Sequence, residues 1–160
     1  MAMPAARGTA TLVPMGQLWE QSQDGVVVFP SGRRIRGRGL RHRVPAGPLP
    51  DFGLYLLGVP PPPVEWESRW LPWRDLRLPS DDLEALDAFR EAWDRAATER
   101  VEVACWRGRG RTGTALACIA ILEGIPPDQA VAFVRQQYRR RTVETPWQHR
   151  YITRFRAGGR

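Results

Sequence analysis

The sequence contains neither lysine nor asparagine, and it has only two cysteines and two histidines. Two cysteines do not make a disulfide framework, and His42 and His149 lie too far apart to suggest a metal site. The longest apolar run near the middle, Leu54–Val59, is too short to cross a bilayer, and residues 1–10 lack the apolar core of a secretion signal. We therefore expect a cytoplasmic protein with reduced thiols and no membrane span.

All 24 basic residues are arginines, and the formal net charge is +7. A GC-rich genome would explain this composition, but arginine also differs chemically from lysine because its planar group can grip phosphate with two hydrogen bonds. Six arginines fall within Arg33–Arg43, which we interpret as a solvated hairpin or loop. The net charge favours anionic partners. No aromatic residues are interleaved with these arginines, so we expect no nucleic-acid partner.

The length of 160 residues fits one domain with a sizeable core. The pattern predicts an α/β fold: a single compact domain over residues 18–156 with a central, mostly parallel sheet flanked by helices. Residues 1–17, rich in small residues, proline and glycine, are expected to form a flexible tail. We predict strands at Val26–Phe29, Phe52–Leu57, Val64–Leu71 (with Trp66 and Trp70 as core anchors) and Val101–Ala104.

Four helices are expected in the second half of the chain. Asp81 and Glu84 have capping-box spacing at the start of the first. Its apolar face is predicted to carry Leu83, Leu86, Phe89, Ala92 and Trp93. The second helix is expected at Thr112–Glu123, and the fourth from Thr145 to about Phe155. The third begins at Pro126-Pro127, and the residues expected to face inward are Ala130, Phe133, Val134 and Tyr138.

The most informative stretch is Val101–Gly113, which runs as strand, glycine-rich loop and helix. The strand leads into Cys105, five residues intervene, and Arg111 and Thr112 open the helix. A loop of this length at a helix N-terminus can turn its backbone N–H groups inward and bind an anion. The same positive field would stabilise a thiolate, and Arg111 could bind two phosphate oxygens. Cys118, inside the helix, is expected to be a small core residue.

Cys105 through Thr112 resembles the C-x5-R-T signature of the protein tyrosine phosphatase superfamily, especially its compact dual-specificity branch. The resemblance implies a dual-specificity-phosphatase-like fold. We expect no metal or cofactor, because the loop amides and Arg111 would meet the charge of the phosphate. The resemblance also implies that Cys105 is the nucleophile that forms a cysteinyl-phosphate, and that Thr112 donates a hydrogen bond to the Cys105 sulfur. Arg111 would stabilise the transition state. The phosphate would be bound by Trp106, Arg107, Gly108, Arg109, Gly110 and Arg111.

The segment Trp73–Pro79 resembles the W-P-D loop that carries the general acid in this superfamily, with Arg74 in the usual place of proline. Asp75, which precedes Cys105 by 30 positions, is therefore the predicted acid of the first step and base of the second. Asp81 and Asp82 are weaker candidates, because a place at a helix N-terminus already accounts for them.

The segment Glu144–Gln148 resembles the Q-T-x-x-Q segment that positions the hydrolytic water in larger relatives. Gln148 fits this role, but Thr145 and Gln148 also fit a capping box, and the two interpretations stay open. Ala104 departs from the family pattern, which has histidine before the nucleophile. The loss of that histidine puts activity in question.

We therefore predict a monomeric phosphatase that acts on phosphorylated protein, with phosphotyrosine expected and phosphoserine and phosphothreonine open. Two alternatives remain: a phosphatase of phosphoinositides or other polyanions, and a phosphate-binding module without turnover. Gly108, Gly110 and Gly113 also match G-x-G-x-x-G, but no second strand with a ribose-binding acid follows, which argues against a dinucleotide site.

Overall fold

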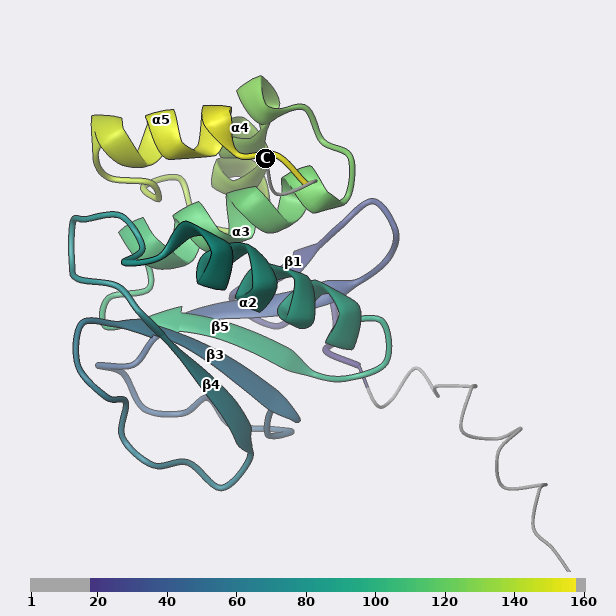
Figure 1. The fold of residues 1–160 in the computed structure, drawn as a ribbon. Coiled ribbons are helices and arrows are strands. Elements are labelled where there is room, and N and C mark those ends of the chain that lie inside the picture. Colours follow the sequence, from purple (N-terminus) through teal and green to yellow (C-terminus); the bar gives the residue numbers. More distant parts are fainter. Residues whose placement is uncertain (1–17, 158–160) are drawn as a thin grey trace, which may run out of the picture.

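Five strands form one sheet in the computed structural model, which describes residues 18–157 (Figure 1). The predicted tail, residues 1–17, lies outside the described residues. The strand order is β1-β2-β5-β3-β4; β1 pairs with β2 antiparallel, and the other pairs are parallel. The strands are β1 (Val26–Val28), β2 (Arg34–Gly39), β3 (Phe52–Leu57), β4 (Glu67–Pro72) and β5 (Val101–Cys105).

The four labelled helices lie on the same side of this sheet (Figure 1). They are α2 (Asp82–Arg95), α3 (Gly110–Leu122), α4 (Pro127–Gln137) and α5 (Pro146–Arg154). Helices α2, α3 and α4 contact the sheet, α4 at its edge strand β1, and α4 and α5 also pack against α3. The predicted single α/β domain with a mostly parallel sheet is therefore confirmed. Within residues 18–157 no helix is long and apolar enough to span a membrane.

The core lies between the sheet and α3, whose residues from Gly110 to Ile121 are all buried. This apolar helix begins two residues before the predicted Thr112, so the end of the glycine-rich loop already belongs to its first turn. The predicted core anchors Trp66 and Trp70 are only partly buried. The fully buried tryptophans are Trp19 and Trp73. The indole groups of Trp66 and Trp70 instead donate hydrogen bonds at the periphery of the sheet.

The prediction of a solvated loop for Arg33–Arg43 is wrong over most of its length. Residues Arg34–Gly39 form β2, an interior strand between β1 and β5. Alternation places Ile35 in the hydrophobic core and the buried Arg36 and Arg38 on the opposite face. Both guanidinium groups donate to Glu102 of β5, with N–O distances of 2.8 Å from Arg36 and 2.7 and 3.0 Å from Arg38. These bonds offset part of the cost of burying the two arginines, although Nε and Nη1 of Arg36 have no hydrogen-bond partner among the described residues.

The carboxylate of Glu102 is the centre of this buried polar cluster. It also accepts a hydrogen bond of 2.7 Å from the hydroxyl of Tyr55 on β3. Burial alone would raise the pKa of Glu102, but the hydrogen bonds and charge of Arg38, together with Arg36, outweigh burial and lower that pKa. The Arg36 guanidinium also lies 4.0 Å from the ring centroid of Trp19, in cation–π geometry.

The apolar face of α2 is shifted from the prediction. Leu83 is 71% exposed, and the buried residues are Ala85, Ala88, Phe89 and Ala92. Asp81 caps the helix as predicted, since its side chain accepts hydrogen bonds from the backbone amides of Leu83 and Glu84. On α4, Ala130 and Val134 are buried as predicted, and Phe133 and Tyr138 pack against the core while partly exposed.

Candidate active site

The Cys105 sulfur lies at the carboxyl end of β5, where the chain turns into the first turn of α3. The residue is buried, and its Sγ accepts two hydrogen bonds of 3.1 Å, one from the backbone amide of Gly108 and one from the hydroxyl of Thr112. Thr112 therefore occupies the place that the sequence predicts. The sulfur therefore has two hydrogen-bond donors beside it at the N-terminus of α3.

The loop from Cys105 to Gly110 packs closely against β2. Gly108 has φ of +73°, and a Cβ atom there would come within 2.6 Å of the backbone at Arg38 and Gly39. Only glycine fits this combination of conformation and contact. The amide of Leu40 donates to the Cys105 carbonyl at 2.8 Å, which extends the β2–β5 pairing into the loop.

Helix α4 supports the loop from the other side. The hydroxyl of Tyr138 donates a hydrogen bond of 2.7 Å to the carbonyl of Gly108. Burial raises the pKa of Tyr138, so the phenol stays a hydrogen-bond donor at neutral pH. Since a peptide carbonyl held outward keeps the neighbouring N–H groups turned inward, Tyr138 helps to set the shape of the loop. The sequence predicted Tyr138 only as a core residue.

The guanidinium of Arg111 connects this loop to the segment that contains Asp75. Its side chain is 5% exposed, its Nη1 donates to the Trp73 carbonyl at 3.1 Å, and its Nη2 lies 3.4 Å from a carboxylate oxygen of Asp75. Among the described residues its buried Nε has no hydrogen-bond partner. The Nε of Arg111 is thus free for an oxyanion, while Nη1 and Nη2 each make one contact with the Asp75 loop.

Asp75 lies in the loop between β4 and α2, and its side chain is 62% exposed. The indole of Trp73 is buried and donates a hydrogen bond of 2.7 Å to the carbonyl of Arg77, so the loop folds over this ring. Asp81, a weaker candidate in the sequence, is the N-cap of α2, and Asp82 begins that helix. Of the three carboxylates, Asp75 is the one paired with Arg111.

Gln148 is fully buried at the start of α5, and its amide is already engaged. Its Oε1 accepts hydrogen bonds from the backbone amides of Glu144 and Thr145, at 3.0 and 3.2 Å. The side chain of Thr145 in turn accepts a hydrogen bond from the backbone amide of Gln148. Its Nε2 donates to the Arg77 carbonyl at 3.3 Å. The capping box is therefore present. The water-positioning role remains a prediction that requires Nε2 to leave the Arg77 carbonyl.

A cleft of about 620 Å³ opens beside Arg111 and Asp75. One wall is apolar and includes Val59, Pro60 and Trp106. Trp106 is 52% exposed despite its place inside the loop, Arg107 is exposed, and Arg109 is partly buried. The sequence analysis did not predict that Val59, Pro60 and Pro62 line the site. The complete lining is Leu57, Gly58, Val59, Pro60, Pro62, Arg74, Asp75, Trp106 and Arg111.

Two other sequence predictions concern the neighbours of Cys105. Ala104, in the usual place of histidine, is fully buried in β5 and pairs in register with Arg38 of β2. Cys118 is fully buried within α3, and burial raises the pKa of its thiol well above its ordinary value. Cys118 is thus a core residue, as predicted. The described residues contain no cluster of His, Cys, Asp or Glu that could hold a metal ion.

Comparison with known proteins finds no matching family model and no matching curated protein. Among solved structures, the chain is similar to Tk-PTP in its active form, with 23% identity and a TM-score of 0.55, over 64% of this chain and 74% of that one. A second Tk-PTP structure, that of a glycine-to-alanine mutant, shares 24% identity with this chain at a TM-score of 0.57. The match covers 66% of this chain and 75% of that one.

A third similar structure is kinase associated phosphatase with its catalytic-site cysteine replaced by serine. It shares 21% identity with this chain at a TM-score of 0.52, over 58% of this chain and 53% of that one. The described residues therefore have the fold of tyrosine and dual-specificity phosphatases, which confirms the fold that the Cys105–Thr112 resemblance implied.

Proposed function

We propose that this protein is a cysteine-dependent phosphatase that hydrolyses phosphomonoesters at Cys105. The observation that carries the proposal is the pair of 3.1 Å hydrogen bonds to the Cys105 sulfur, from Gly108 and Thr112, beside a buried Arg111 donor without a partner among the described residues. A structural core cysteine such as Cys118 has no need of such donors. The likeness in fold to phosphatase structures supports the same assignment.

In the first step the Cys105 thiolate attacks phosphorus, and the bond from phosphorus to the ester oxygen breaks. Asp75, in its protonated form, gives its proton to the departing oxygen. Arg111 contacts Asp75 in the described structure, and the arriving phosphate supplies oxygens for its free Nε and for the N–H groups of the loop. The products are the alcohol or phenol and a cysteinyl-phosphate.

In the second step a water attacks the cysteinyl-phosphate, and the carboxylate of Asp75 accepts a proton from that water. The bond from phosphorus to sulfur breaks, inorganic phosphate forms, and the electron pair returns to Cys105 as a thiolate. The Thr112 hydroxyl, 3.1 Å from the sulfur, stabilises the charge that appears there. Gln148 takes part in this step only if it exchanges the Arg77 carbonyl for the attacking water.

The cleft favours an aromatic ester as substrate. An aryl group joined to a phosphate at Arg111 would lie against Trp106 and the Val59–Pro60 wall, where apolar contact stabilises binding. We therefore propose phosphotyrosine in proteins as the first substrate class, with phosphoserine and phosphothreonine accepted less well. Cytoplasmic location and a monomeric state are part of this proposal.

The exposed arginines near the site favour the second candidate, a phosphatase of phosphoinositides or other polyanions. Arg74 lines the cleft, and Arg107 projects from the loop into solvent. A panel of phosphopeptides and phosphoinositides separates the two classes. Preference for phosphotyrosine peptides supports the first class, and preference for highly phosphorylated lipids supports the second.

Hydrolysis of p-nitrophenyl phosphate tests the reaction itself. We expect turnover in the wild type, none above background in Cys105→Ser, and a loss of about 100-fold or more in Asp75→Asn. The matched control is Cys118→Ala, which removes the other thiol and should retain turnover. If none of these proteins turns over substrate while all bind phosphate, the third candidate, a phosphate-binding module, replaces the phosphatase.

A further inference from the structure

Leu76, which directly follows Asp75, adopts a left-handed backbone conformation with φ of 62°. Residues other than glycine rarely adopt this conformation, because their Cβ crowds the neighbouring carbonyl oxygen. It persists where surrounding contacts enforce it. The contacts that hold Leu76 therefore also fix the position of the Asp75 carboxylate.

The strongest of these contacts comes from α5. The indole Nε1 of Trp147 donates a hydrogen bond of 2.6 Å to the carbonyl of Leu76, across 71 positions of the chain. The next carbonyl, that of Arg77, accepts from Trp73 at 2.7 Å and from Gln148 at 3.3 Å. Two consecutive carbonyls after Asp75 are thus held by side chains, and the α5 donors are adjacent residues of its first turn.

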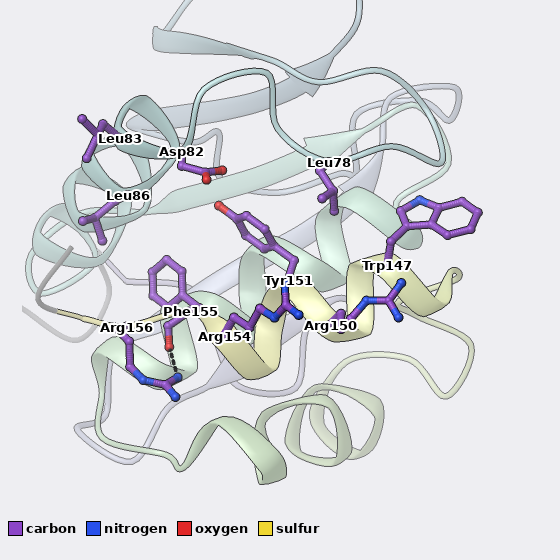
Figure 2. A pocket seen from close by; sticks show the side chains of 10 residues that line it. All are labelled: Leu78, Asp82, Leu83, Leu86, Trp147, Arg150, Tyr151, Arg154, Phe155 and Arg156. Carbon is purple, nitrogen blue, oxygen red and sulfur yellow. Dashed lines mark hydrogen bonds between the residues drawn. The ribbon is translucent and has the colours of Figure 1, made fainter. Parts of the chain in front are cut away.

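Helix α5 provides a fixed support for these donors. Its N-terminus is closed by the capping box of Thr145 and Gln148, and Ile152 is fully buried in the core. Figure 2 shows Trp147 at the beginning of the yellow helix, on the side where Leu78 of the Asp75 loop lies. The tryptophan therefore joins a rigid element to a loop that lacks regular structure.

Apolar packing alone does not fix this loop. Leu76 is 47% exposed, Leu78 is 38% exposed and Trp147 is 43% exposed. A hollow lined by these three residues and Arg77 lies between the loop and α5. Since these side chains bury only part of their surface, the backbone at Leu76 depends on two hydrogen bonds. One is the turn bond of 3.1 Å from the Arg77 amide to the Arg74 carbonyl, and the other is the Trp147 bond to the Leu76 carbonyl.

We propose that Trp147 is a positioning residue for the general acid, and that its indole N–H holds Leu76 so that Asp75 stays beside Arg111. This inference rests on the proposed phosphatase function. Loss of the N–H would let Leu76 return to a common backbone conformation and would turn Asp75 away from the cleft. Protonation of the leaving group would then slow, while attack by Cys105 would not.

The test uses Trp147→Phe, which keeps an aromatic ring and removes the N–H, and two substrates that differ in their need for an acid. Phenyl phosphate releases a phenol that must be protonated, whereas 2,4-dinitrophenolate leaves readily as an anion. We expect kcat/KM for phenyl phosphate to fall by about five- to tenfold, the effect of one lost hydrogen bond, with less than a twofold change for dinitrophenyl phosphate. Trp93→Phe, which removes the Trp93–Glu123 bond far from the site, is the matched control and should change neither.

Two further measurements make the result decisive. In an Asp75→Asn background, Trp147→Phe should cause no added loss on phenyl phosphate, because the two residues act through one proton transfer. Amide hydrogen exchange over residues 73–79 should accelerate in Trp147→Phe and not in Trp93→Phe. Equal losses on both substrates, additive losses in the double variant, or unchanged exchange would each overturn the proposal. If Cys105→Ser retained full turnover, the proposed function would fail, and the exchange experiment alone would still decide whether Trp147 holds the loop.

Discussion

Replacement of Thr112 by valine is the sharpest test of the second chemical step. Thr112 is fully buried, and its hydroxyl donates to the Cys105 sulfur at 3.1 Å. Valine has nearly the same shape, so the variant removes one hydrogen bond and leaves the packing in place. A hydrogen bond to a charged group contributes about 1.5–3 kcal/mol, which corresponds to a rate loss of roughly 10- to 100-fold.

The loss should fall on the hydrolysis of the cysteinyl-phosphate, because sulfur gains negative charge as it leaves phosphorus. Formation of the intermediate needs the thiolate as a nucleophile and should change much less. We therefore expect rapid mixing of Thr112→Val with p-nitrophenyl phosphate to give a burst of nitrophenolate close to one equivalent of enzyme, followed by slow turnover.

A matched control is available two residues along the chain. Thr114 is also fully buried, but its hydroxyl donates to the Gly110 carbonyl at 2.6 Å and does not reach the sulfur. Thr114→Val should show no burst. The reasoning is refuted if Thr112→Val slows the burst phase as much as the steady state, or if both variants behave alike.

Three further predictions concern the cleft and the buried cluster. Trp106→Ala should raise KM for aryl phosphates by about three- to tenfold with little change in kcat, because the exposed ring would contact the substrate and not the reacting atoms. A decrease in kcat in steady-state kinetics would contradict this. Glu102→Ala should lower the free energy of unfolding by about 3–5 kcal/mol in urea titrations, because it leaves two buried guanidinium groups without their acceptor. The control is Glu65→Ala at an exposed position, whose free energy of unfolding should stay within about 0.5 kcal/mol of the wild-type value. Because the pKa of Glu102 is lowered in the folded protein, its contribution to stability is complete at pH values above its ordinary pKa of 4.5. That contribution is lost as the pH falls through the lower pKa of the folded state. An unfolding midpoint in urea that is the same at neutral pH and below about pH 4 would contradict this.

The sequence predicted the order of elements and the residues around Cys105 because that information is local. A strand, a glycine-rich loop and an apolar helix follow one another within Val101–Leu122, and the geometry of the loop depends on nearby residues. Asp75 was also predictable, although its contact with Arg111 spans many positions, because the surrounding segment resembles an acid loop.

Other features depend on partners that no local pattern reveals. The arginines of β2 look like a solvated run until Glu102, 64 and 66 positions away, is placed between them. Leu83 matches a helical apolar period but is exposed, because tertiary packing buries the face of α2 that carries Ala85, Ala88, Phe89 and Ala92. Trp147 looks like an ordinary residue of a first helical turn, and its bond to Leu76 exists only because α5 begins beside the Asp75 loop.

The buried cluster of Arg36, Arg38 and Glu102 lies on the face of the sheet opposite the four described helices, and it has a consequence for Ala104. Two guanidinium groups share a single carboxylate there, and Arg38 pairs in register with Ala104 while Gly39 pairs with Cys105. The strand next to the sulfur therefore carries a surplus positive charge, enclosed by protein and little affected by dissolved ions. That permanent cation supplies an electrostatic bias toward anions on the strand that lies beside Ala104 and Cys105.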